Sequence, residues 1–63
     1  MTITLRHADG RETIHRDIAQ LDAGNCREIT LFPLFEDTVT LVGFSVRRID
    51  CLSGHVYLEE DPS

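Results

Sequence analysis

The dipeptide Asp9-Gly10 separates two segments of alternating polarity, ITLRHA before it and RETIHR after it. Asp-Gly is typical of a two-residue type I′ hairpin turn, because both turn positions require a positive φ. Pairing outward from this turn places Leu5 opposite Ile14, with Ile3 on the same face. One shared apolar face is what a half-buried antiparallel ribbon requires, so the chain is predicted to begin with a β-hairpin.

A second hairpin is predicted around Ser53-Gly54, near the other end of the chain. In the register that this turn implies, Arg48 lies opposite Glu59, and oppositely charged partners stabilise such a pair. The same register gathers four apolar residues on one face: Ile49, Cys51, Val56 and Leu58.

The segment between the hairpins contains one short helical pattern and two further strands. Residues 17–21 resemble a helical turn, with Asp17 as the N-cap and Gln20 at the capping-box position. The stretch EITLFPLFEDTVTLVGFSV is rich in Thr, Val, Ile and Phe, as strands are, and is interrupted near Glu36-Asp37. Pro33 predicts a sheet edge or a bulge in the first of these strands.

These elements predict a mainly β fold, a small antiparallel meander or a partly open barrel of five to six short strands with one short helical turn. With 63 residues there is room for one small core. We expect residues 1–58 to form a single β-rich domain. Residues 59–63 are expected to form an acidic, flexible C-terminal tail.

The charge of the chain bears on its partners. Eleven Asp and Glu residues stand against six arginines and no lysine, which gives a formal net charge of -5. Such a chain repels a phosphate backbone and attracts a basic surface. We therefore expect a basic protein surface as the partner, and no direct binding of nucleic acid.

Localisation and chemistry are constrained mainly by what the sequence lacks. It shows neither a basic, apolar leader nor an apolar run long enough to cross a bilayer, so a cytoplasmic protein with reduced Cys26 and Cys51 and no membrane contact is expected. The alternative, in an oxidising compartment, is a single disulfide between the two cysteines. Cys51 and His55 have a plausible spacing for metal ligands, but the predicted register places them on opposite faces. We expect no metal site, no cofactor, no catalytic residues and no enzymatic activity.

The apolar run LFPLF, residues 31–35, has large side chains at both parities of a strand that should bury one face. Curling of the sheet or the helical turn covers the second face in the simplest interpretation. The alternative is a homodimer or partner interface that includes Phe32 and Phe35.

The order of these elements resembles that of the Sm-like small barrels. The resemblance is carried by the strand that ends at Asp9-Gly10, the returning strand, the short turn, two apolar strands, the arginine-bearing segment VRRI of residues 46–49 and a last strand. The chain is similar in particular to the acidic Rof-type proteins, which inhibit the transcription terminator Rho. That resemblance implies an Sm-like barrel that binds an RNA-handling protein rather than RNA.

The leading hypothesis is a small acidic, non-enzymatic protein that binds and inhibits a basic, nucleic-acid-handling protein. Rof-type inhibitors and phage anti-CRISPR or other nucleic-acid-mimicking proteins are the comparable classes. The alternative is a homo-oligomeric Sm-like structural or assembly module that uses the LFPLF strand as its interface. The predicted partner-binding residues are Glu36, Asp37, Glu59, Glu60, Asp61, Phe32 and Phe35.

Overall fold

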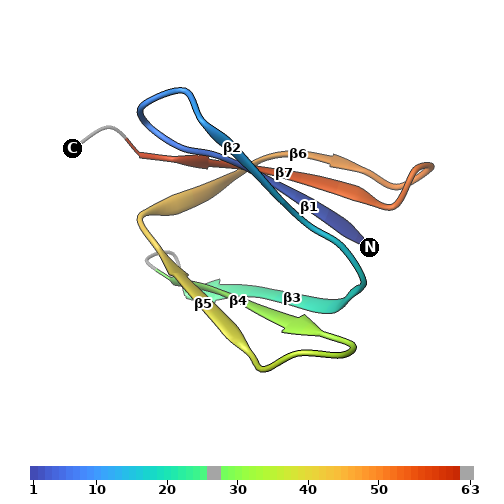
Figure 1. Ribbon diagram of the computed structural model, residues 1–63. Helices are drawn as coiled ribbons and strands as arrows, with labels where there is room; N and C mark the ends of the chain where they lie inside the picture. Colours follow the sequence, from blue (N-terminus) through green and yellow to red (C-terminus); the bar gives the residue numbers. More distant parts are fainter. Residues whose placement is uncertain (26–27, 62–63) are drawn as a thin grey trace.

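The computed structural model describes residues 1–25 and 28–61, and the chain is mainly β (Figure 1). Seven strands and no helix are found in this part of the chain. The strands are β1 (Thr2–Arg6), β2 (Glu12–His15), β3 (Ile18–Asn25), β4 (Glu28–Pro33), β5 (Val39–Val42), β6 (Phe44–Asp50) and β7 (His55–Glu60).

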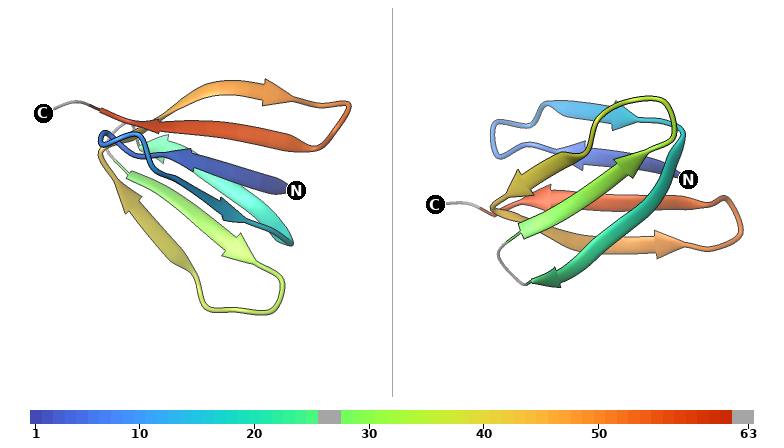
Figure 2. Two further views of the ribbon diagram at one scale, coloured as in Figure 1. Left: turned by 45° about the horizontal axis from the view of Figure 1, so that its top comes forward. Right: turned by 90° about the horizontal axis from the view of Figure 1, so that it is seen from below.

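The strands form two sheets that lie face to face (Figure 2). One sheet has four strands in the order β2-β1-β7-β6, and the other has three in the order β3-β4-β5. β1 and β7 are parallel, whereas the other neighbours are antiparallel. The predicted meander is therefore broken where the last strand lies between the first strand and β6.

The core fills the space between the two sheets. Ile3 and Leu5 of β1 alternate with outward-facing residues and are almost completely buried. The other core residues follow the same alternation or lie where the chain passes from one sheet to the other. They are Ile18, Ile29, Leu31, Phe44, Val56 and Leu58.

The first predicted hairpin exists, but its predicted register is wrong by one residue. Leu5 lies opposite Thr13, and Ile14 lies opposite Thr4. The N–H of His7 donates to the carbonyl of Arg11 at 2.8 Å, which leaves a loop of three residues, 8–10. Within this loop the N–H of Gly10 donates to the carbonyl of His7, and Gly10 alone has a positive φ, of 92°. A one-residue shift moves every side chain of the returning strand to the other face, so Ile14 is 55% exposed instead of buried.

The second predicted hairpin also exists, with a loop of four residues instead of two. Asp50 pairs with His55 and Ile49 with Val56, a shift of two residues that keeps the apolar side chains on their predicted face. Cys51, however, lies in the loop and is exposed, and Ile49 is 63% exposed, so of the four residues predicted to share this apolar face only Val56 and Leu58 are buried. The predicted pairing of Arg48 with Glu59 is also wrong, because Arg48 lies opposite Tyr57.

The predicted helical turn at residues 17–21 is wrong, because residues 18–21 belong to strand β3. Asp17 has a φ of 56°, and this left-handed residue turns the chain from β2 into β3 instead of capping a helix. Ile18 is 2% exposed and exchanges two backbone hydrogen bonds with Met1. The two bonds with Met1 and the pairing of β3 with β4 therefore take the place of the local hydrogen bonds of a helical turn, while the side chain of Ile18 enters the core.

Pro33 is the last residue of β4, the central strand of its sheet. The predicted edge is therefore wrong, since β4 has a neighbour on each side. The predicted irregularity lies on the partner strand, where the register shifts between Ile18 and Gln20, opposite Pro33 and Phe32. Proline is tolerated at this position because the strand ends there.

The end of the chain continues the sheet beyond the predicted domain boundary at residue 58. Glu59 and Glu60 belong to β7, and the N–H of Asp61 donates to the carbonyl of Gly43 at 2.7 Å. The remainder of the predicted tail, residues 62 and 63, lies outside the described residues, and so does Cys26.

Candidate functional site

The loop between β4 and β5, residues 34–38, consists entirely of exposed residues, and we call it the acidic loop. Leu34 is 60% exposed and Phe35 is 83% exposed, directly before the exposed carboxylates of Glu36 and Asp37. Two large apolar side chains are thus held in water next to two negative charges. Exposed apolar residues rimmed by polar ones are typical of protein interaction sites.

The local sequence explains why this loop leaves the sheet. Pro33 ends β4, and the N–H of Leu34 then donates to the carbonyl of Asp17 at 2.9 Å. This bond ties the start of the loop to the corner between the two sheets. The inward positions of the neighbouring strands are already filled by Leu31 and Val39, so the side chains of the loop have no core to enter.

The negative charge of the three-stranded sheet extends beyond the acidic loop. Residues 18–42 contain four carboxylates and one arginine, Arg27, which lies outside the described residues. Each of the four ion pairs found in the described part of the chain belongs to the four-stranded sheet or its hairpin loops. The carboxylates of this region are those of Asp22, Glu28, Glu36 and Asp37.

Glu28 and Asp22 line a shallow hollow of about 220 Å³ together with Gly24 and Thr30. Asp22 Oδ1 accepts a hydrogen bond from the N–H of Gly24 at 2.9 Å, which orients this carboxylate on the bulged end of β3. The sequence signal that identifies these two residues is their alternation with the half-buried Leu21 and the buried Ile29, which places them on the outer face.

The three predicted carboxylates at the end of β7 are engaged within the fold. Glu59 Oε2 lies 3.4 Å from Nε of Arg47. Glu60 Oε1 accepts a hydrogen bond from the N–H of Ala8 at 2.9 Å, and Asp61 Oδ1 accepts one from the hydroxyl of Ser45 at 3.3 Å. These contacts join β7 to its neighbours, so they give the three residues a structural role.

The predicted partner-binding residues therefore do not form one patch. Glu36, Asp37 and Phe35 lie together in the acidic loop, whereas Glu59, Glu60 and Asp61 lie at the end of β7, on a distant part of the molecule (Figures 1 and 2). Phe32 is half-buried on β4, opposite Gln20 of β3, and is separate from the loop.

The LFPLF segment cannot add a strand from a second copy along its edge. β4 is hydrogen-bonded to β3 on one side and to β5 on the other. Leu31 is completely buried, and only Leu34 and Phe35, which follow the strand, are exposed. An interface formed by this segment would therefore have to use side-chain packing instead of strand pairing.

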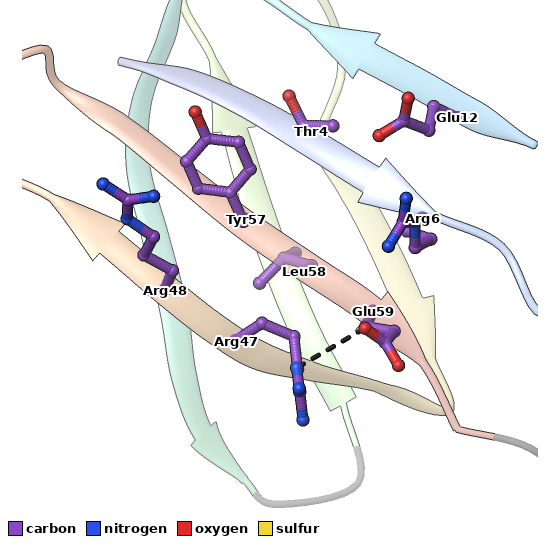
Figure 3. Close-up of a pocket in the computed structure, with 8 residues that line it drawn as sticks. All are labelled: Thr4, Arg6, Glu12, Arg47, Arg48, Tyr57, Leu58 and Glu59. Carbon is purple, nitrogen blue, oxygen red and sulfur yellow. Dashed lines mark ion pairs between the residues drawn. The ribbon is translucent and has the colours of Figure 1, made fainter.

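A second hollow, of about 450 Å³, lies on the outer face of the four-stranded sheet (Figure 3). Sequence reasoning did not predict it, because it depends on the parallel pairing of β1 with β7. Its residues come from the β1–β2 hairpin and the β6–β7 hairpin, which lie near opposite ends of the sequence. Its lining residues are Thr4, Arg6, Glu12, Arg47, Arg48, Tyr57, Leu58 and Glu59.

Aromatic stacking and one ion pair link some of the side chains on this face. The rings of Tyr57 and His55 stack with their centroids 4.4 Å apart, and Cζ of Arg48 lies 5.7 Å from the centroid of the Tyr57 ring. The register shift between Val46 and Arg48 lets Arg47, instead of the predicted Arg48, approach Glu59. The hollow thus has three arginines and two glutamates in its lining, and one ion pair, between Arg47 and Glu59, joins the two kinds of charge (Figure 3).

Cys51 and His55, whose spacing in the sequence is plausible for metal ligands, have different surroundings in the structure. Cys51 is an exposed free thiol in the β6–β7 loop, whereas Nε2 of His55 lies 2.6 Å from the hydroxyl of Thr4. In residues 1–25 and 28–61, no three His, Cys, Asp or Glu side chains form a group that could hold a metal ion.

The chain matches no protein-family model and no curated protein. None of the described segments is a helix with the length and apolar character needed to cross a membrane.

Proposed function

We propose that this chain is a non-enzymatic binding protein that inhibits a basic, nucleic-acid-handling partner by occupying the surface on which that partner binds nucleic acid. One observation carries the proposal. The acidic loop holds Leu34 and Phe35 in water beside Glu36 and Asp37, and those two carboxylates make no ion pair with any described residue.

The two kinds of side chain in the loop have different roles in such a complex. The carboxylates of Glu36 and Asp37 steer a basic surface toward the loop and raise the association rate. Phe35 then enters a pocket of the partner, since desolvated aromatic anchors account for most of the affinity of an interface. The dissociation rate depends on this anchor more than on the charges.

The charge distribution favours a protein partner over nucleic acid. A phosphate backbone needs a continuous basic surface, and arginines 47 and 48 are paired with or lie near carboxylates. The net charge of -5 adds a repulsion that acts over the whole molecule. A basic protein surface is instead attracted by the net negative charge and does not need a continuous basic surface on this chain.

The Rof-type inhibitors and the phage anti-CRISPR proteins are the classes that this proposal resembles in size and charge. The mainly β chain and two facing sheets support a partly open barrel as its architecture. The parallel pairing of β1 with β7 is a feature that an antiparallel Sm-like meander would not have. The proposed mechanism depends on the acidic loop and not on that likeness.

The test begins with affinity capture on the immobilised chain from the native host, followed by purification of each captured protein. A true partner binds labelled single-stranded RNA or DNA, and the chain displaces that nucleic acid. The association rate between chain and partner falls as the salt concentration rises. A captured protein whose nucleic-acid binding is unaffected, or an association rate that is independent of salt, contradicts the proposal.

Two charge-matched variants locate the site. Asp37→Lys in the acidic loop and Glu12→Lys on β2 each change the net charge by the same amount at an exposed position. We expect Asp37→Lys to slow association about tenfold or more, because steered association rates vary over one to three decades. Glu12→Lys should have a much smaller effect. Equal effects of the two variants would show that total charge, and not the loop, determines binding.

The Phe35→Ala variant tests the anchor separately. We expect it to raise the dissociation rate about tenfold, which corresponds to about 1.4 kcal/mol, with little change in the association rate. Phe35 is 83% exposed in the free chain, so its truncation should leave the folded protein intact. An unchanged dissociation rate would remove Phe35 from the interface.

A further inference from the structure

The loop between β1 and β2 contains two neighbouring residues that can react with each other. In an Asp-Gly sequence the main-chain nitrogen of the glycine can attack the side-chain carboxyl group of the aspartate, because glycine has no side chain to hinder the approach. The loop requires this glycine, since Gly10 has a φ of 92°, a conformation that residues with a Cβ rarely adopt. The fold therefore places a reactive pair in a loop where the side chain of Asp9 is 54% exposed.

The reaction is an isomerisation that uses only water from the solvent. The Gly10 nitrogen bonds to Cγ of Asp9, and one oxygen of the protonated carboxyl group leaves as water, with the carboxyl proton and the proton of the Gly10 N–H. The product is a succinimide ring. Addition of water at Cγ restores Asp9, whereas addition at the main-chain carbonyl carbon of Asp9 breaks its bond to the Gly10 nitrogen. The chain then runs through Cβ and Cγ, and this isoaspartate has the mass of aspartate and one additional main-chain atom.

Both reacting groups have other partners in the structure. The N–H of Gly10, whose proton must leave, donates to the carbonyl of His7 at 2.9 Å. Asp9 Oδ1 accepts a hydrogen bond from the N–H of Arg11 at 3.0 Å, and Asp9 Oδ2 accepts one from Nε of Arg11 at 2.6 Å. The nitrogen and the carboxylate are thus each bonded to a third residue instead of being free to meet.

The contacts of Asp9 also favour the form of the carboxyl group that does not react. Ring closure expels a carboxyl oxygen as water, so it requires the protonated group. The hydrogen bond from the N–H of Arg11 contributes most to holding the pKa of Asp9 below its ordinary value, and the side chain of Arg11 adds to this effect. The protonated group is therefore rarer in the folded loop than in an unfolded chain at the same pH.

We propose that Asp9-Gly10 is a latent isomerisation site, which the closed hairpin loop and the side chain of Arg11 keep unreactive in the folded chain. This proposal goes beyond the binding function and does not depend on it. The site belongs to the four-stranded sheet, whereas the acidic loop connects two strands of the other sheet (Figure 1).

Two further hydrogen bonds hold the loop closed. The N–H of His7 donates to the carbonyl of Arg11 at 2.8 Å, across the base of the loop. The N–H of Ala8 donates to Glu60 Oε1 at 2.9 Å and attaches the loop to β7. Attack on Cγ of Asp9 has to await the opening of these contacts, so the rate of isomerisation depends on the fraction of time that the loop is open.

Isoaspartate at position 9 alters the connection that sets the register of the hairpin. The additional main-chain atom lies between His7 and Arg11, whose hydrogen bond closes the loop of three residues. The free carboxylate of isoaspartate is attached directly to Cα, so it no longer occupies the position from which Asp9 bonds Arg11. We therefore expect isomerisation to weaken the pairing of β1 with β2.

The first experiment compares the full chain with a peptide of residues 6–13 during incubation at the same neutral pH and temperature. Isoaspartate is measured by enzymatic methylation of its free carboxylate, and chromatography of proteolytic fragments locates it at position 9. We expect the folded chain to react about tenfold or more slowly, because the loop must first open. Equal rates in the chain and the peptide overturn the proposal.

The second experiment measures the same reaction in two folded variants. Arg11→Ala removes the guanidinium and keeps the main-chain N–H, whereas the matched control Arg16→Ala removes the same charge at an exposed position beyond β2. We expect Arg11→Ala to isomerise about two- to fivefold faster, the factor that corresponds to an exposed ion pair. Arg16→Ala should match the unaltered chain. No acceleration in Arg11→Ala, or equal acceleration in both variants, overturns the role of Arg11.

Hydrogen exchange at the N–H of Gly10 distinguishes bonding of the carboxylate from closure of the loop. Faster isomerisation of Arg11→Ala with unchanged exchange supports the proposal that the side chain acts on Asp9. If exchange accelerates by the same factor as isomerisation, Arg11 acts only by closing the loop, and its proposed effect on the carboxylate is wrong. Far-UV circular dichroism and the denaturant midpoint establish that each variant is folded.

The third experiment tests the consequence of the modification. The isomerised chain is separated from the unaltered chain by chromatography, and the two are compared by denaturant unfolding and by hydrogen exchange at the N–H groups of His7 and Gly10. We expect a lower midpoint and faster exchange in the isomerised chain. An unchanged midpoint with unchanged exchange would show that the hairpin accommodates the additional atom, which overturns the expected weakening of the β1–β2 pair.

Discussion

The hydroxyl of Thr4 lies 2.6 Å from Nε2 of His55, across the parallel pair formed by β1 and β7. Thr4 is 8% exposed although it lies on the outer face of its sheet, because the stacked rings of His55 and Tyr57 lie beside it. This contact links two residues that are 51 positions apart in the chain. It therefore reports directly on the pairing of the first strand with the last.

The Thr4–His55 bond is expected to contribute about 0.5–1.5 kcal/mol to stability, the usual net value for an intramolecular hydrogen bond. Thr4→Val keeps the shape of the side chain and removes the hydroxyl, and His55→Phe keeps a ring for stacking on Tyr57. A double-mutant cycle of these two changes, measured by denaturant unfolding, should give a coupling energy in that range. A coupling energy near zero would mean that the two side chains do not interact in solution.

Both hairpins could be predicted from the sequence, but their registers could not. The rule for Asp-Gly assumes that Asp9 adopts a positive φ, whereas its side chain instead accepts a hydrogen bond from the N–H of Arg11 at 3.0 Å. That bond favours a three-residue loop with Gly10 as its left-handed residue. The two loop types have the same sequence signal and differ by one residue in register.

The strand after Asp17 could not be predicted for a related reason. Aspartate is favoured both as a helix N-cap and as a left-handed turn residue, since its short side chain suits both. The choice here is made by Ile18, which is buried between sheets whose other residues are remote in the sequence. Local pattern alone cannot supply that information.

The candidate site was predicted in part. The acidic loop could be found because Glu36 and Asp37 interrupt an apolar stretch. The roles of Glu59 and Glu60 could not, because their partners Arg47 and Ala8 depend on the bulge in β6 and on the parallel pairing of β1 with β7. Nonlocal pairing decides which carboxylates remain available to a partner.

Leu31 and Leu34, both within the LFPLF segment, should differ sharply in their effect on stability. Leu31 is completely buried at the centre of β4, so Leu31→Ala should cost about 2–5 kcal/mol. A domain of this size has only roughly 3–9 kcal/mol of stability, so this variant is expected to be largely or wholly unfolded near physiological temperature. Leu34→Ala, at a side chain 60% exposed, should change stability by less than about 0.5 kcal/mol. Thermal unfolding followed by circular dichroism separates the two; equal melting temperatures would contradict the described core.

Gly43 is the corner at which β5 turns into β6. Its φ is 80°, and its carbonyl accepts a hydrogen bond from the N–H of Asp61. A Cβ would meet no atom within 4 Å, so Gly43→Ala tests backbone strain alone and should cost about 1–2 kcal/mol. Gly43→Asn is the matched comparison, because asparagine enters the left-handed region more readily than alanine, so it should cost less than Gly43→Ala. If both variants unfold at the same denaturant concentration, Gly43 does not hold the left-handed conformation.

Acid should destabilise the β6–β7 hairpin through Asp50. The N–H groups of Ser53 and Leu52 donate to its carboxylate at 3.3 and 3.1 Å, and the bond from Ser53 contributes most to holding the pKa of Asp50 below its ordinary value. A group whose pKa is lowered by folding stabilises the native state above its unfolded pKa, about 3.9, and this contribution is lost as the pH falls through the lower folded pKa.

Asp50→Asn separates the charge of this side chain from its hydrogen bonds, because the amide oxygen still accepts from the two N–H groups but does not titrate. We expect the unaltered chain to lose stability more steeply than Asp50→Asn as the pH falls below about 4, when denaturant unfolding is measured at a series of pH values. The carboxyl carbon of Asp50, followed by NMR, should titrate below the ordinary range. Parallel stability curves for the two proteins, together with an ordinary titration of Asp50, would show that the turn does not select the ionised carboxylate.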